Sequence, residues 1–237
     1  MFASGLIACS TSSWHYADKK ESLNFWSWSS QNLPAFFATV VKTLLLSDTF
    51  LSPFPIEYAQ ASDVLAACGG VQSLQWWTAE ELPTVALSSI SQLPLQRLSL
   101  NLYDVARMIA SPVPPAWLTS LTHLDVSVSI LIMSLEVSYL EQLRHLPRLT
   151  HVALGPLESG TELLCATCPS LQILVILILP GTTLDNANLF DPRVIVTEFP
   201  ADSKKEWEAR HFGLPNIWTY AEGVVAERKR LALPRGD

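Results

Sequence analysis

A six-residue pattern with apolar side chains at its first, fourth and sixth positions occurs six times along this chain. Side chains alternate between the two faces of a strand, so positions 4 and 6 share one face and positions 3, 5 and 7 share the other. All eighteen residues at positions 1, 4 and 6 are apolar: Val41, Leu44, Leu46, Val71, Leu74, Trp76, Leu95, Leu98, Leu100, Leu121, Leu124, Val126, Leu149, Val152, Leu154, Leu171, Leu174 and Ile176. The pattern predicts six short strands that each bury one face and turn the other toward water.

The spacing of these hexads indicates how the strands are connected. Their first residues are separated by 22 to 30 residues. A connection between parallel strands needs about a dozen residues and is usually helical, and repeats of about 20 to 29 residues are typical of leucine-rich repeats. We therefore expect an α/β solenoid, an irregular leucine-rich-repeat horseshoe with a parallel sheet on its concave face and uneven helices on its convex face.

The connecting segments predict helices with different clarity. Apolar residues have helical spacing over Tyr58–Cys68, and two glycines follow as a stop signal. The clearest amphipathic stripe lies between residues 133 and 146, and a shorter helix is expected over Glu162–Thr167. Residues 104–120 contain three prolines in their second half, so only the first turns of that segment are predicted to be helical.

The repeats divide the chain into three parts. Residues 36–200 are expected to form the solenoid, residues 1–35 a poorly defined N-terminal segment or cap, and residues 201–237 a C-terminal helical cap and tail. Because each repeat contacts only its neighbours, the outermost hydrophobic layers need covers. A degenerate copy of the pattern in the first part suggests a strand or cap there, at Leu23, Trp26 and Trp28.

The C-terminal part begins after a seventh strand, which is expected at residues 192–196. The run from Ser203 to Glu206 matches a capping box and predicts the start of a short helix. A final helix is expected from about Asn216 to Leu231, with one apolar stripe. We expect this capping helix to cover the open edge of the sheet.

Three hexads in particular resemble leucine-rich repeats, namely Leu95–Leu100, Leu121–Val126 and Leu149–Leu154. Together with Val41–Leu44, Ala67–Val71, Asp191–Arg193 and a Trp-rich tail that ends in Arg-Lys-Arg, they resemble the F-box-associated leucine-rich-repeat proteins of mushroom-forming fungi. The resemblance covers about residues 36–231. It implies a substrate-receptor-like component of a ubiquitin ligase, with ligase components as partners. An F-box is not recognisable, because Leu33-Pro34 is followed almost at once by the first repeat.

Charge and motif content favour a binding function over catalysis. A net charge of -7 argues against a nucleic-acid partner, and the basic run Arg228–Arg230 suits a helix C-terminus, with nuclear import as the alternative. No nucleophile elbow, phosphate loop, zinc-protease or dinucleotide motif occurs, so we expect no enzyme activity and no cofactor.

The longest apolar run is Ile173–Leu179, which is too short to cross a membrane. We expect a cytoplasmic protein, with a nuclear location as the alternative.

Two cysteines occupy the same place in their repeats. Cys68 and Cys168 each stand three residues before the first position of a hexad, at Val71 and Leu171. This shared phase predicts two small buried thiols that pack under a strand. Because Cys165 and Cys168 form a CxxC motif, zinc binding and redox chemistry are the alternatives.

The candidate binding residues lie on the strand face opposite the predicted core. Arg97, His123 and His151 occupy position 3 of consecutive hexads, so on parallel strands they should lie side by side on the concave face. The surrounding exposed positions are expected at Gln75, Trp77, Asn101 and Asp125. Such a mixed patch suits a protein or peptide partner, and the alternative is a row of solvated residues without one. No metal site is expected, because Arg97 repels cations and no further ligand is supplied.

The last hexad departs from this polar face. Ile173, Val175 and Leu177 are apolar at positions where exposure is expected. Either the C-terminal tail folds over these residues or they form a second adhesive surface.

Overall fold

The chain forms an open parallel β-sheet whose strands lie in sequence order. The computed structural model describes residues 7–10, 34–47, 58–77, 81–127, 137–155, 160–182 and 191–232. Within them the sheet has eight strands: β1 (Ile7–Ser10), β2 (Thr43–Ser47), β3 (Ser73–Trp77), β4 (Arg97–Asn101), β5 (His123–Ser127), β6 (His151–Leu154), β7 (Ile173–Ile178) and β8 (Val194–Glu198). Every neighbouring pair is parallel, so the expected α/β class and parallel sheet are confirmed.

Each predicted hexad forms a strand that begins at the third hexad position. All eighteen predicted core residues are buried, and the most exposed of them, Ile176, is only 4% exposed. The register places the fourth positions opposite one another, for example Leu98 beside Leu124 and Leu124 beside Val152. The predicted strands and their buried face are therefore confirmed.

One pair of backbone hydrogen bonds recurs from hexad to hexad. The carbonyl at position 2 of a hexad accepts the N–H groups of positions 2 and 3 of the next, at 2.8 to 3.1 Å. The accepting residues are Lys42, Gln72, Gln96, Thr122 and Thr150. The same local geometry is thus built five times in succession, although the connecting segments differ in length and composition.

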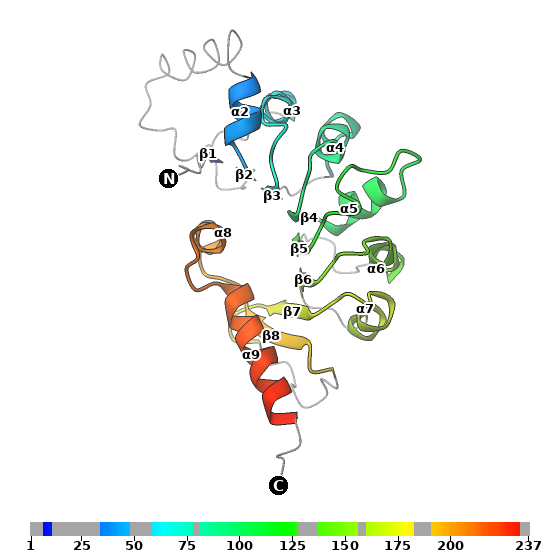
Figure 1. The fold of residues 1–237 in the computed structure, drawn as a ribbon, viewed down its shortest axis with the longest axis vertical. Coiled ribbons are helices and arrows are strands. Elements are labelled where there is room, and N and C mark those ends of the chain that lie inside the picture. The colour runs from blue at the N-terminus through cyan, green and yellow to red at the C-terminus, as the bar shows by residue number, and fades with distance from the viewer. Residues whose placement is uncertain are drawn as a thin grey trace.

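Helices cover the outer side of the curved sheet (Figure 1). They are α2 (Pro34–Val40), α3 (Tyr58–Ala67), α4 (Thr84–Ser91), α5 (Leu102–Ile109), α6 (Val137–Gln142) with a 3-10 turn at Leu143–His145, and α7 (Thr161–Thr167). The helices expected from Tyr58, from Glu162 and at the start of residues 104–120 are confirmed. The expected 133–146 helix is present from Val137 onward, and its first residues lie outside the described part. Neither α2 nor α4 was predicted.

The C-terminal helices α8 (Ser203–Phe212) and α9 (Ile217–Ala232) lie on the inner side of the curve (Figure 1). The expectation that the final helix covers the open edge of the sheet was wrong. Its apolar stripe packs instead on the inner face of the last strands, in one buried cluster: Ala153, Ile173, Val175, Leu177, Ile195, Ile217, Trp218, Ala221 and Val225. Burial of these inward-facing apolar side chains stabilises the inner position, so the tail does fold over them.

Helix α9 reaches the open edge only through one side chain. Arg228 Nη1 donates to the backbone carbonyls of Pro192 at 3.1 Å and Val194 at 2.7 Å. These bonds occupy acceptors beside β8 that no further strand pairs with in the described structure. At the other edge, β1 pairs with β2, whereas the strand or cap expected at residues 23–28 lies outside the described residues.

Helix α8 begins with a different cap from the one predicted. Its N-cap is Asp202, whose carboxylate accepts the N–H of Lys205 at 3.0 Å, so Ser203 lies inside the helix. Gly213 ends α8 in the left-handed conformation, with φ of 68°, which glycine adopts without steric cost. Helices α8 and α9 and the turn between them are called the C-terminal hairpin below. No helix in the described part of the chain has the length and apolar character needed to span a membrane.

Candidate functional site

The predicted polar row is aligned as expected. Arg97, His123 and His151 are direct register partners on β4, β5 and β6. The two imidazole rings stack, with centroids 4.2 Å apart and planes inclined by 11°. The prediction that these three residues lie side by side on the inner face is confirmed.

The expectation that this face is open to water was wrong, because the C-terminal hairpin covers it. Trp218 of α9 meets both imidazoles edge to face, with centroids 5.6 Å from each ring. His151 and Asp125 are each only 8% exposed and Gln75 only 1%. The sequence predicts which residues share this face, whereas the cover comes from a segment far along the chain.

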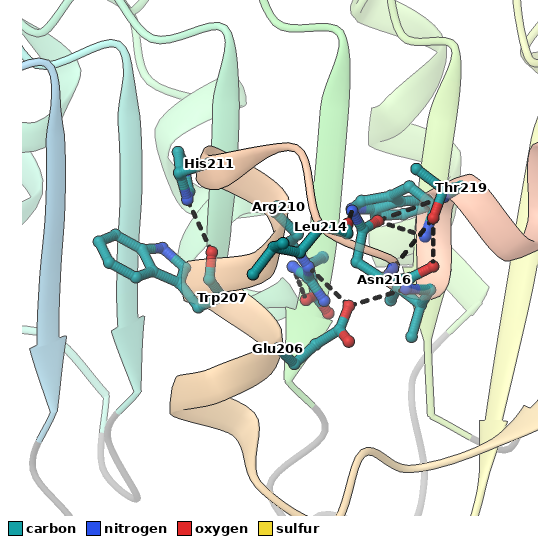
Figure 2. Close-up of polar contacts among 10 residues, drawn as sticks. Glu206, Trp207, Arg210, His211, Leu214, Asn216 and Thr219 are labelled. Atoms are coloured by element: carbon teal, nitrogen blue, oxygen red, sulfur yellow. Dashed lines mark hydrogen bonds and ion pairs between the residues drawn. The ribbon is translucent and has the colours of Figure 1, made fainter. Parts of the chain in front are cut away.

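A buried ion-pair network joins the sheet to the hairpin. Arg210 of α8 donates from Nη1 to Asp125 of β5 at 2.8 Å, and both side chains are only about 10% exposed. Its Nε donates to Glu206 at 3.2 Å, and Glu206 also accepts the N–H of Ile217 at 2.9 Å. Figure 2 shows Glu206 lying between Arg210 and the start of α9. Arg210 therefore links α8 to β5 and, through Glu206, to the start of α9.

His211 forms a second link, between α8 and β3. Its Nδ1 lies 2.7 Å from the Trp207 carbonyl and its Nε2 lies 2.9 Å from Ser73 Oγ. Because a carbonyl only accepts, Nδ1 carries the proton, and in the neutral ring Nε2 accepts from the serine hydroxyl. Burial lowers the pKa of His211, which favours this neutral form.

Neighbouring threonines fix the tautomers of the stacked histidines. Thr122 Oγ1 donates to the Gln96 carbonyl at 3.0 Å, so His123 Nδ1, 2.9 Å away, must donate to that oxygen. Thr150 Oγ1 stands in the same relation to His151. In the neutral rings both Nε2 atoms are therefore acceptors, and that of His151 faces Glu222 of the hairpin.

The stacked histidines are held mainly uncharged. Burial, followed by the charges of His151, Arg97 and Arg210, lowers the pKa of His123 to about 3. Burial also lowers the pKa of His151, and Glu222 opposes that shift. His151 Nε2 lies 3.4 Å from Glu222 Oε1. Two acceptors repel at that distance, so this contact is attractive when His151 is protonated.

The contact between sheet and hairpin leaves a small space unfilled. A cavity of about 20 Å³, close to the size of one water molecule, lies between β3–β5 and α8. Gln75 lines it, and its side-chain carbonyl oxygen is buried without a hydrogen-bond partner. Water-sized spaces beside polar side chains also occur in protein–protein interfaces.

Asn101 has a structural contact at the end of β4. Its side-chain oxygen accepts the N–H of Tyr103 at 3.0 Å and caps the N-terminus of α5. It is 7% exposed, so the expected exposure was wrong here as well. The side chain of Trp77, the remaining predicted site residue, lies outside the described part of the structure.

The cap at Asn101 gives a testable prediction. Asn101→Ala should lower the free energy of unfolding by about 1 kcal/mol, because the N–H of Tyr103 loses its acceptor. Asn101→Ser, which keeps a capping oxygen, should cost less. Urea denaturation of the two variants checks this, and equal losses would show that the capping bond is not the cause.

The two cysteines in equivalent repeat positions behave as predicted. Cys68 and Cys168 are buried, and each donates its N–H to the carbonyl four residues earlier and accepts from the first residue of the next hexad. Cys165 is half-buried, and burial raises the pKa of its thiol to about 11, which keeps it protonated and poorly nucleophilic. Among the described residues, no three His, Cys, Asp or Glu side chains are grouped to hold a metal ion.

The hairpin supplies the site residues that the sequence analysis missed. Arg210, His211 and Glu222 were not singled out, because a helix sequence does not specify the sheet it will pack against. The inward apolar triplet Ile173, Val175 and Leu177 was the available signal, since it requires a cover. Comparison of the chain with models of protein families, with curated proteins and with solved structures found no match.

Proposed function

We propose that this chain is a leucine-rich-repeat-like solenoid that acts as a non-catalytic protein-binding module through the inner face of its sheet. The hairpin then occupies the binding surface in the closed state. The recurring backbone hydrogen bonds and the unbroken hexad register support the solenoid. The C-terminal hairpin, which is helical and packs on the inner face, supports the proposal that this face is a binding surface.

The observation that carries this proposal is the chemistry of the contact between sheet and hairpin. At β3–β5 the hairpin is held by side-chain pairs, Arg210 to Asp125 and His211 to Ser73. At β6–β8 it is held by an apolar cluster. An apolar patch with paired polar groups beside it is the combination found in protein–protein interfaces.

A substitution that opens the hairpin tests the proposal. Ala221 lies on the side of α9 that packs against the sheet and is fully buried, so Ala221→Glu should detach that helix, because an unpaired buried charge is costly. The chain's own hairpin, supplied as a peptide of residues 199–232, should then bind the full-length variant in trans. It should bind wild type at least about tenfold more weakly, because the tethered copy competes at a high effective concentration.

The matched control is Ala226→Glu, which places the same charge on the exposed face of α9. It should behave like wild type. Trp218→Ala opens the hairpin without adding a charge and should also bind the peptide. Fluorescence anisotropy measures binding, and hydrogen exchange shows whether the sheet stays folded. If both opened variants lost protection throughout β4–β6, or bound no peptide, the hairpin would be part of the core and the proposal would fail.

A further inference from the structure

Resting on the proposed function, we propose that the partner of the inner face is an amphipathic helix that presents a tryptophan and, four residues later, a carboxylate. We infer the side chains that such a partner needs from the contacts that the chain's own hairpin makes with the inner face. These contacts specify four positions of such a helix, occupied here by Trp218, Ala221, Glu222 and Val225.

The stacked histidines form the site for the tryptophan. Trp218 presents its ring to the edges of His123 and His151 at 83° and 87°, and it is 5% exposed. The guanidinium of Arg210 lies 5.6 Å from the centre of the same indole. Edge-to-face contact with two imidazoles and a cation on the ring together favour a large electron-rich aromatic side chain. Indole suits these three contacts best.

The carboxylate lies against one member of the histidine pair, His151. Residues 218 and 222 are one helical turn apart and lie on one face of α9. This places Glu222 beside His151 Nε2, the nitrogen that the Thr150 contact leaves facing the helix. Arg97, two strands away on β4, is attracted to Glu222 as well. Position 222 therefore favours an anionic side chain through Arg97 and, when it is protonated, through His151.

The apolar half of the face sets the remaining two positions. Ala221 is fully buried and Val225 is 4% exposed, in one cluster with Val175 and Ile195 of the sheet. A larger residue at the position of Ala221 has no room unless the helix moves away from the sheet. Spacings of three, four and seven residues after the tryptophan lie on one face of a helix. An extended peptide, whose side chains alternate, cannot present them together.

The experiment compares synthetic helices with an unrelated host sequence. The matching peptide carries Trp, Ala, Glu and Val at these spacings in an Ala/Lys/Gln background. Its control has the same composition with the tryptophan moved two positions, to the opposite side of the helix. Anisotropy titrations use the full-length Ala221→Glu and Trp218→Ala chains, with the 199–232 hairpin peptide as the reference ligand. The matching peptide should bind at least about 30-fold more tightly than its control, as expected for a buried aromatic anchor.

The acidic position has its own readout. Replacement of the peptide's Glu by Gln should weaken binding about two- to fivefold at pH 5, where a larger fraction of His151 is protonated than at neutral pH, because the contact is partly exposed to solvent. The difference should shrink at pH 8, where His151 is neutral.

Equal binding of the matching and shifted peptides, with the hairpin peptide still bound, would overturn this inference and leave the inner face as a binding surface. Failure of all three peptides would overturn the proposed function as well. Dimerisation of the opened chains that excludes the peptides would identify a second copy as the occupant and would also overturn the inference.

Discussion

Leu124→Ala is expected to lower the free energy of unfolding by about 2 to 5 kcal/mol. Leu124 lies at the fourth position of the fourth of the six hexads and is fully buried. Its register partners Leu98 and Val152 are buried beside it on β4 and β6. Removal of its terminal carbons leaves a cavity that two flanking strands, each fixed by its own hydrogen bonds, cannot close. Urea denaturation followed by far-UV circular dichroism measures the loss.

Leu179→Ala is the matched control for this prediction. Leu179 directly follows β7 and is 55% exposed, so the same chemical change should alter stability by no more than about 0.5 kcal/mol. The two variants differ only in the face and position of the leucine. Comparable losses in both would contradict a core built from the hexad positions.

The strands and their buried face could be predicted because each hexad carries its own signal. Burial at positions 1, 4 and 6 depends on a two-residue alternation that is visible within six residues. The register follows because a shift by one residue would turn the buried face to water. For this reason the alignment of Arg97, His123 and His151 was also predictable.

The connecting helices were less predictable because their sequences are less regular. Helix α4 is an example: its buried residues are Ala86, Leu87 and Ile90, a small set in a serine-rich segment. Ser89 and Ser91 direct their hydroxyls to the carbonyls four residues earlier, which satisfies these hydroxyls within the helix. Serine otherwise favours caps and turns, so composition alone does not indicate the helix.

The cover over the site could not be predicted because it depends on contacts between distant segments. Arg210 and Asp125 are 85 residues apart in the chain, and His211 and Ser73 are 138 residues apart. Neither pair forms a sequence motif. The apolar triplet on β7 showed that something had to cover that strand, but not that the cover extends over the polar row. The ligase link implied by the resemblance to F-box-associated proteins stays a prediction.

Acidification is expected to detach the C-terminal hairpin before the sheet unfolds. His123, His151 and His211 all lie between sheet and hairpin, and burial lowers the pKa of each, that of His123 to about 3. A histidine whose pKa is lowered by folding stabilises the folded state above its unfolded pKa of about 6.5, and that contribution is lost as the pH falls. The hairpin should therefore be most secure at neutral pH and loosen progressively below about pH 6.5.

Charged neighbours decide how steep this loss is. Arg97 and Arg210 repel protonated imidazoles and increase it. Asp125 and Glu206 are already paired with Arg210, so Glu222 is left as the carboxylate that opposes the loss, through His151. From about pH 7 to pH 5, His123 alone accounts for roughly 1 to 2 kcal/mol after allowance for its partial exposure. All three histidines titrate in this range, whereas the hexad positions of the buried leucine core carry no titratable group. The hairpin should therefore open well before the core is affected.

Hydrogen exchange measured at about pH 7 and pH 5, with correction for the intrinsic pH dependence of exchange, tests this. Amides of α9 should lose protection at the lower pH while those of β4–β6 keep theirs. His123→Phe retains a flat ring that cannot be protonated, so it should remove part of the acid sensitivity. His145→Phe, at an exposed position on the outer side, should leave it unchanged. If both variants responded to acid like wild type, the imidazole at position 123 would not be a source of the effect, because of the two replaced histidines only His123 lies against the hairpin.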